Sequence, residues 1–320
     1  ETEEWKMAKL TADDIKRVKG MGFLKNTTNE GFSMRVITKN GVLTSSQMRC
    51  LAEVADRWGQ GTVALTTRLT AEIPGIRYED IETVREFIGK EGLVSGGTGS
   101  RVRPVVACKG TVCQYGNCDT QALALRIHDR FFVDYYDVKL PHKFKIAVGG
   151  CPNNCVKPDL NDLGLAGVTV PDLDGDKCLG CRKCAVENVC PMDAAHVVEG
   201  KLVIDREKCN NCGRCVTRCR FDAVTPGKKG FAAYLGGRWG KKTRIGSKLP
   251  KVYSEEEAME LIEKAILLFR DKGENGERLA SMVDRLGEDA VFAMLEGDDL
   301  LRRKEEILKK EMSAEGGATC

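Results

Sequence analysis

The sequence predicts a mixed α/β protein, of the α+β or α/β class, made of two successive units with a cysteine-rich insertion in the second. Strand-like and helix-like stretches alternate from residue 32 to residue 90 and alternate again afterwards. Eight cysteines crowd into one short segment, and the stretches on either side of it look continuous with each other. The expected boundaries are 1–95 for the first unit, 96–170 with 227–320 for the second, and 171–226 for the insertion.

The first unit is predicted as strand, helix, strand and helix. A strand is expected over 32–43, followed by a helix that Ser45 and Ser46 can cap and that Gly59 ends. The stretch 62–68 is rich in β-forming residues, and apolar residues at helical spacing predict a second helix over 78–90. A Gly-rich and Ser-rich linker over 95–100 then separates the two units.

The second unit begins with a short strand at 105–107, a helix over 119–131 and a strand over 144–148 that leads into Gly149-Gly150-Cys151. After the insertion, 230–244 predicts a Gly-rich, basic strand and turn. A capping box at Ser254 and Glu257 opens an amphipathic helix. The charged stretch 274–310 is expected to be helical with a solvated face, and the last residues are expected to be disordered.

Composition excludes several classes of function. The net charge of +3 provides no general basis for nucleic-acid binding, and 42% hydrophobic with 30% charged residues is ordinary for a soluble globular protein. The longest apolar run near the C-terminus, 265–269, is too short to span a bilayer, and the N-terminus has no targeting pattern. Twelve of the 15 cysteines fall into ligand-like patterns, which indicates a reducing, cytoplasmic location.

Four cysteines of the second unit form two pairs, Cys108 with Cys113 and Cys151 with Cys155. A thiolate quartet of this kind binds a [4Fe-4S] cluster. Cys118 follows Cys113 at the interval that separates Cys113 from Cys108, so Cys118 is an alternative ligand to either of them.

The insertion carries the pattern of a bacterial two-cluster ferredoxin, in which three thiolates of one run share a cluster with the last thiolate of the other run. Disulfides and structural zinc are the alternatives, but paired cysteine triplets do not fit the usual zinc spacing. One cluster is expected on Cys178, Cys181, Cys184 and Cys219, and the other on Cys209, Cys212, Cys215 and Cys190.

Basic residues stand close to the first quartet in the sequence. Lys143 and Lys145 are two residues apart at the start of a predicted strand, so both side chains are expected on one face. Their two ammonium groups can then converge on one small anion. Binding an oxyanion and protonating its leaving oxygens requires such a concentration of positive charge.

The cysteine pairs, the Arg103-Pro-Val-Val-Ala-Cys108 segment and the Leu140-Pro-His-Lys-Phe-Lys145 segment together resemble the sirohaem-containing nitrite and sulfite reductases. The match extends over about 32–287 and is closest to the catalytic C subunits of anaerobic, NADH-linked, dissimilatory-type sulfite reductases. The resemblance implies a ferredoxin-like half-domain, a domain that binds sirohaem and a [4Fe-4S] cluster, and an inserted two-cluster ferredoxin domain. It also implies three [4Fe-4S] clusters, with Cys155 bridging one of them to the sirohaem iron.

The resemblance further implies the roles of individual basic residues. Arg35, Arg103, Lys143 and Lys145 match the substrate side of the family's site. Sirohaem carries eight carboxylates, which charge-assisted hydrogen bonds would hold. The alternative for any of these residues outside the motifs is an ordinary surface position. The candidates for holding the carboxylates are Thr66, Thr67, Arg68, Arg101, Arg238, Lys241 and Arg244.

The function that follows is the six-electron reduction of sulfite to sulfide, with electrons passed through the ferredoxin-type clusters. Residues 96–100 lack the context of a dinucleotide fingerprint, so electrons are expected from partners, a flavin-containing NADH subunit and an iron–sulfur subunit. Reduction of nitrite to ammonia on the same cofactor is one alternative, and a three-cluster electron-transfer subunit without sirohaem is another. A twofold homodimer with a shared active site is a further expectation.

Overall fold

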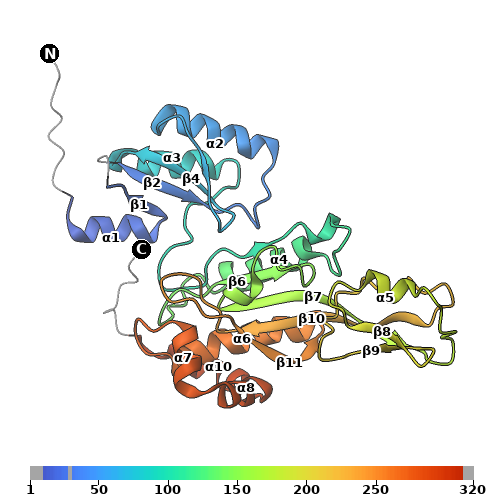
Figure 1. The fold of residues 1–320 in the computed structure, drawn as a ribbon. Coiled ribbons are helices and arrows are strands. Elements are labelled where there is room, and N and C mark those ends of the chain that lie inside the picture. The colour runs from blue at the N-terminus through green and yellow to red at the C-terminus, as the bar shows by residue number, and fades with distance from the viewer. Residues whose placement is uncertain (1–9, 28–30, 313–320) are drawn as a thin grey trace.

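The computed structural model describes residues 10–27 and 31–312. The first unit of the chain forms a four-stranded antiparallel sheet with the strand order β1-β2-β4-β3 (Figure 1). Phe32, Met34 and Ile73 pack in its core against Leu51 and Val84 of two helices. The elements are α1 (Ala12–Gly20), β1 (Phe23–Lys25), β2 (Phe32–Val36), α2 (Ser45–Trp58), β3 (Ala64–Leu65), β4 (Ala71–Ile76), the 3₁₀ turn η1 (Tyr78–Asp80) and α3 (Ile81–Gly89).

The structure of this unit differs from the prediction in three respects. The strand expected over 32–43 ends at Val36, because Lys39, Asn40 and Gly41 adopt positive φ angles that a strand cannot continue through. Strand β4 was not expected, since Pro74 and Gly75 normally interrupt a strand. A bulge between the β2–β4 pairs accommodates them. The helix cap is Thr44 rather than Ser45 or Ser46.

The second unit forms a five-stranded sheet with the order β11-β10-β7-β6-β5. The neighbours β5, β6 and β7 are parallel, whereas β10 pairs antiparallel with both β7 and β11. The elements up to the insertion are β5 (Val106–Ala107), the 3₁₀ turn η2 (Gly110–Val112), α4 (Thr120–Ile127), the π-turn η3 (His128–Val133), β6 (Ile146–Gly149), the 3₁₀ turn η4 (Pro158–Leu160) and β7 (Leu163–Leu173).

The chain returns to this sheet through two strands and ends in helices. Helix α6 is buried along most of its length, and its capping box at Ser254 and Glu257 is present as predicted. The C-terminal helices cover the lower part of the molecule in Figure 1. These elements are β10 (Val224–Leu235), β11 (Ser247–Tyr253), α6 (Glu255–Lys272), α7 (Leu279–Leu286), α8 (Glu288–Glu296), α9 (Asp299–Arg302) and α10 (Lys304–Lys309).

The charged C-terminal stretch is more than a solvated face, which corrects the expectation for 274–310. Arg278 forms an ion pair with Asp162, a carboxylate with no exposed surface, and Arg303 pairs with Asp271, whose side chain is 8% exposed. The disorder expected at the extreme C-terminus concerns residues 313–320, which lie outside the described residues, as do residues 1–9 of the N-terminus.

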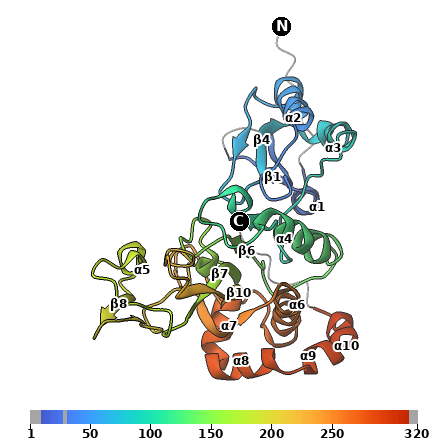
Figure 2. The same ribbon diagram turned by 90° about the vertical axis from the view of Figure 1, so that its right-hand side faces the viewer.

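Residues 174–223 project from the five-stranded sheet between two strands that pair with each other, since Leu173 stands opposite Val224. The segment contains α5 (Ala185–Val189), β8 (Ala195–Val198) and β9 (Lys201–Ile204) around a small apolar cluster. Both views show α5 and β8 at the end of the molecule far from the first unit (Figures 1 and 2). The assignment of this segment as a separate ferredoxin domain stays a prediction.

Candidate functional site

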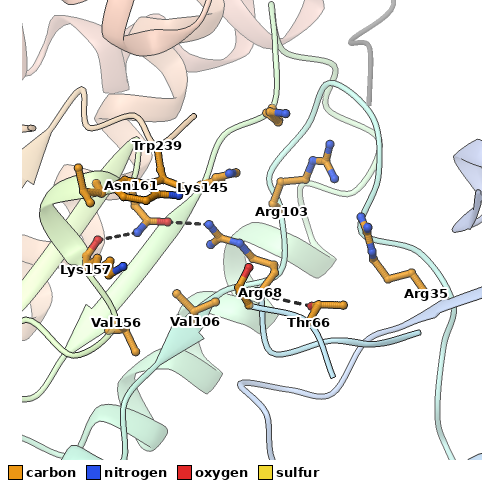
Figure 3. Close-up of a pocket in the computed structure, with 13 residues that line it drawn as sticks. Arg35, Thr66, Arg68, Arg103, Val106, Lys145, Val156, Lys157, Asn161 and Trp239 are labelled. Atoms are coloured by element: carbon orange, nitrogen blue, oxygen red, sulfur yellow. Dashed lines mark hydrogen bonds between the residues drawn. The ribbon is translucent and has the colours of Figure 1, made fainter. Parts of the chain in front are cut away.

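A cavity of about 380 Å³ lies between the two sheets and is lined by side chains from both units (Figure 3). Six of the lining residues are cationic and none is acidic, so the cavity suits an anion. We call it the cation cavity. Its lining residues are Arg35, Thr66, Thr67, Arg68, Arg103, Val106, Lys143, Lys145, Val156, Lys157, Leu160, Asn161 and Trp239.

Arg68 connects the two units across this cavity. It stands in the turn between β3 and β4, and its Nη2 donates a 2.7 Å hydrogen bond to Oδ1 of Asn161 in the second unit. The Nδ2 of Asn161 donates to the carbonyl of Lys157. Burial lowers the pKa of Arg68 to about 10, which leaves its guanidinium charged at neutral pH. The three residues form a continuous row in Figure 3.

The two other arginines of the cavity are held by groups of the protein. Nε and Nη2 of Arg35 donate to Oε1 of Glu72 on the neighbouring strand, at 2.8 and 2.5 Å. Nη1 of Arg103 donates to the carbonyl of Gly97 at 2.5 Å. These partners fix the guanidinium orientations before any ligand is present. For Arg35, Glu72 also neutralises part of the charge offered to the cavity.

Lys145 stands where β6 begins, and its backbone N–H donates to Oδ2 of the buried Asp162 at 2.9 Å. Burial, followed by the nearby charge of Arg68, lowers the pKa of Lys145 to about 8, while Asp162 acts in the opposite direction. Arg278 donates to both carboxylate oxygens of Asp162 at 3.0 and 3.1 Å. A buried ion pair therefore anchors the strand that carries Lys145.

Lys143 also lines the cavity, so the two lysines approach one space as their spacing predicted. The backbone N–H of Lys143 donates to Nδ1 of His142. Burial and then Arg278 lower the pKa of His142 to about 4. This imidazole is therefore neutral at physiological pH and adds no charge to the cation cavity.

Four predicted cofactor residues do not line the cavity. Arg101 donates to the carbonyl of Tyr136 and lies 4.6 Å from the centre of that ring. Arg244 is held by Asp284 and Glu288, and Arg238 by the carbonyl of Lys242 and by Ser281. Lys241 is exposed in the β10–β11 connection. In this structure these cations belong to the surface or stabilise the hairpin.

Three polar or aromatic lining residues were missed in the sequence: Lys157, Asn161 and Trp239. Lys157 has a φ of 51°, in the left-handed region, and its ammonium lies 4.8 Å from the ring of Trp239. Trp239 is 62% exposed, which is unusual for so large an aromatic side chain. The only sequence signal was the position of Lys157, two residues after Cys155.

The first cysteine quartet lies directly beside the cavity. We call it the core quartet, and two lining residues adjoin it in the chain: Val106 precedes Cys108 by two positions, and Val156 follows Cys155. The backbone N–H of Gly150 donates to Sγ of Cys108 at 3.1 Å. The members of the core quartet are Cys108, Cys113, Cys151 and Cys155.

The core quartet is compact, and Cys118 lies at its edge. Burial raises the pKa of Cys151, and the other three thiols of the quartet contribute to its electrostatic environment. Burial raises the pKa of Cys118 to about 12, and Sγ of Cys118 packs against Gly167, where an added Cβ would approach to 2.7 Å. Cys118 thus has the surroundings of a packed thiol.

The structure brings four of the eight cysteines of the insertion together, and the other four stay a predicted quartet. Cys190, Cys209, Cys212 and Cys215 line one small cavity of about 20 Å³. We call these four the second quartet, which unites three residues of one run with the last residue of the other, as the ferredoxin pattern predicts. The remaining thiols are called the third quartet and are Cys178, Cys181, Cys184 and Cys219.

The donor sets suit iron–sulfur clusters. None of the 14 described cysteines forms a disulfide. Backbone N–H groups reach sulfur in both insertion quartets, from Ala194 to Cys190 and from Leu202 to Cys178. Such bonds favour thiolates, and those from Gly180 and Leu202 lower the pKa of Cys178.

The described residues contain no group of three or more His, Cys, Asp or Glu side chains that could hold a single metal ion. A cubane cluster differs from such a site, because each of its four thiolates binds a different iron atom. Within the same described ranges, no helix is long and apolar enough to cross a membrane.

Comparisons with known proteins agree with this geometry. Residues 98–300 match the nitrite and sulphite reductase 4Fe-4S domain, and residues 25–90 match the nitrite/sulfite reductase ferredoxin-like half domain. The crystal structure of dissimilatory sulfite reductase I superposes with a TM-score of 0.66 at 20% identity, and covers 89% of this chain and 72% of that one. This likeness shows the shared fold.

Two curated relatives are similar in sequence. The coenzyme F420-dependent sulfite reductase of Methanocaldococcus jannaschii is 30% identical over 88% of this chain and 43% of its own length. The C subunit of the anaerobic sulfite reductase of Salmonella typhimurium is 33% identical over 45% of each chain. The matches cover less than half the length of these relatives. Because the 4Fe-4S domain matches more than half of this chain and the half domain matches the part before it, this chain belongs to the nitrite and sulphite reductase family.

Proposed function

We propose that this chain is the catalytic subunit of a sirohaem sulfite reductase. The observation that carries the proposal is the cation cavity, which holds six basic side chains and no acidic one and adjoins the core quartet. A three-cluster electron-transfer subunit would not need a concentration of positive charge beside one cluster. A reductase of small oxyanions does need it.

The residues fit the implied cofactors. The core quartet would hold a [4Fe-4S] cluster, with Cys155 as the thiolate shared with the sirohaem iron. Arg68 and Lys157, together with Thr66 and Thr67, would bind carboxylates of the macrocycle. Trp239 would add an aromatic contact to the macrocycle. When bound, the coupled sirohaem and cluster supply the electrons that no side chain can supply.

The side chains of this chain would bind the substrate and deliver protons. Arg103, Lys143 and Lys145 would surround a small oxyanion, and Arg35 would add a guanidinium already oriented by Glu72. Reduction of sulfite to sulfide releases the substrate oxygens as water and therefore consumes protons. Lys145 is protonated at neutral pH, and its pKa of about 8 makes its Nζ a readier proton donor than an ordinary lysine.

The electrons would come from separate donor subunits, as the naming of the Salmonella relative as one subunit of its enzyme suggests. We expect a flavin-containing NADH subunit and an iron–sulfur subunit. Both the cysteines and the basic residues of the proposed site come from this one chain. A shared site in a homodimer is therefore unnecessary, although a twofold contact between copies remains a prediction.

Cofactor content and turnover test the proposal together. The anaerobically prepared protein is expected to yield sirohaem on pigment extraction, with iron and sulfide for three [4Fe-4S] clusters. It should reduce sulfite to sulfide with a low-potential artificial donor. Stoichiometric clusters without extractable sirohaem would leave the electron-transfer alternative. Turnover of nitrite far above that of sulfite would make it a nitrite reductase.

A further inference from the structure

The insertion touches the second unit next to the core quartet, and Asn117 lies at the centre of this contact. Asn117 lies in the loop between Cys113 and Cys118, and its backbone N–H donates a 2.8 Å hydrogen bond to the carbonyl of Gly150. Gly150 immediately precedes Cys151 in the core quartet. The backbone of Asn117 is therefore attached to a turn that carries a cluster ligand.

The side chain of Asn117 points to the insertion. Its Nδ2 donates to the carbonyl of Cys212 at 3.3 Å and to that of Gly167 on β7 at 3.2 Å. Its Oδ1 accepts a hydrogen bond from Thr169 Oγ1 at 2.9 Å. One amide thus joins a ligand of the second quartet to the central sheet and, through its own backbone, to the core quartet.

The contact around Asn117 is tight on the insertion side. A Cβ added to Gly213 would lie 3.0 Å from Oδ1 of Asn117, and Gly213 has a φ of 72°. The N–H of Thr169 donates to the carbonyl of Asn211, and Arg214 lies over the ring of Tyr115. The 211–214 loop is therefore held against the 113–118 loop at several points.

We propose that Asn117 is a positioning residue that holds the second quartet against the core quartet. Its hydrogen bonds form a short bonded route from Cys212 to Cys151, by way of the carbonyl of Gly150. With both quartets loaded, the cluster of the second quartet would be the one that reduces the core cluster, by transfer of one electron from the former to the latter.

The third quartet is the first in the proposed order of electron transfer and the most distant from the core quartet in that order. Its residue Cys178 accepts a hydrogen bond from Leu202 of β9, within the insertion itself. Cys212 of the second quartet is instead bonded to Asn117 of the second unit. The cluster of the third quartet would therefore receive electrons first, from an external low-potential one-electron donor. The order is third, second and core quartet.

This inference rests on one part of the proposed function, namely that the cysteine quartets hold iron–sulfur clusters. It does not require sirohaem. The test compares the wild-type protein with Asn117→Ala, with the milder Thr169→Val, and with Asn188→Ala. Asn188 is an exposed amide in α5 of the same insertion and serves as the matched control. The readouts are iron and sulfide content, amide hydrogen exchange at 211–214, and the magnetic interaction between clusters in paramagnetic resonance spectra of the reduced protein.

Asn117→Ala should keep its iron and sulfide while exchange at 211–214 accelerates roughly tenfold, as expected for the loss of two or three hydrogen bonds. The magnetic interaction between the second and core clusters should weaken, a change that a structural role elsewhere would not produce. Thr169→Val should shift both readouts less, in the same direction, and it decides the matter if Asn117→Ala does not fold. Asn188→Ala should match the wild type.

Two results would overturn the inference. The first is wild-type hydrogen exchange and wild-type spectra in Asn117→Ala, or in Thr169→Val where Asn117→Ala does not fold. The second is a core cluster that interacts magnetically with the cluster of the third quartet and not with that of the second. Failure of the proposed function has another signature. A protein without sirohaem that still shows the Asn117-dependent interaction would lose the reductase assignment and keep the cluster order.

Discussion

The cation cavity and the insertion hold their functional groups in opposite ways. In the cavity, each arginine and Lys145 is fixed by protein groups, such as Asn161 for Arg68 and Asp162 for the strand of Lys145. The insertion has only a small apolar cluster, one five-residue helix and a two-stranded sheet around its eight cysteines. The cavity is therefore organised by the chain itself, whereas we expect the insertion to depend on the clusters proposed for its cysteines.

The largest expected effect follows from this dependence. Removing iron with a chelator under reducing conditions should abolish hydrogen-exchange protection throughout 174–223, because cluster binding is folding free energy for so small a core. The four-stranded sheet of the first unit, with its own core, should keep its protection. If the iron-free insertion kept its hydrogen-exchange protection, the insertion would fold without clusters, and the claimed difference between it and the cavity would be wrong.

The second prediction concerns the buried ion pair beneath the cavity. Asp162→Ala leaves Arg278 without its partner in a buried position and should lower the free energy of unfolding by about 3–5 kcal/mol. Asp284→Ala removes a half-exposed partner of Arg244 and should cost at most about 1 kcal/mol. Denaturant titration of the two cluster-loaded variants measures both. Equal losses would show that the cavity is not anchored by Asp162.

The third prediction uses the pH dependence of substrate affinity. Lys145 carries its positive charge below its pKa of about 8, so affinity for the oxyanion should be full near pH 7. Above pH 8 it should fall about tenfold per pH unit, as for the loss of one required proton. Lys145→Arg keeps the charge over this range and should flatten the profile. A flat profile in the wild type would mean that Lys145 does not contact the anion.

The smallest effect is expected at Cys118. Cys118→Ser should retain the full iron content of the core quartet, because the thiol packs against Gly167 of β7. Cys113→Ser should lose that cluster. Iron analysis and the cluster spectrum of both variants distinguish the two thiols. The reverse pattern would make Cys118 the ligand.

The sequence revealed those features whose evidence is local. The spacing of the cysteines and of Lys143 and Lys145 predicted which side chains would gather, and the structure brings Cys190 to Cys209, Cys212 and Cys215 as the pattern required. Hydrogen-bond and ion-pair partners that are distant in the chain could not be predicted from the sequence. Glu72, which holds Arg35, is 37 residues away, and Arg278 is 116 residues from Asp162.

Residues in irregular segments were also missed. Lys157 and Trp239 reach the cavity from a left-handed turn and from a hairpin loop, where no periodicity indicates direction. Arg238 and Arg244 were expected at the cofactor because they are basic and close to glycines. Their backbones form the isolated bridge that closes their own hairpin, and their role at the cofactor stays a prediction.

Equilibrium binding of sulfite tests the central claim, that the cation cavity binds the oxyanion, most directly. Sulfite titration of the sirohaem-loaded protein would be followed by visible absorption in the wild type, in Lys143→Ala and in Lys248→Ala, an exposed lysine on β11 outside the cavity. Lys143→Ala is predicted to keep its sirohaem and to weaken sulfite binding roughly a hundredfold, the scale of losing one preorganised charged donor. Lys248→Ala should bind like the wild type. Equal affinity in all three proteins would contradict the assignment of the cavity as the substrate site.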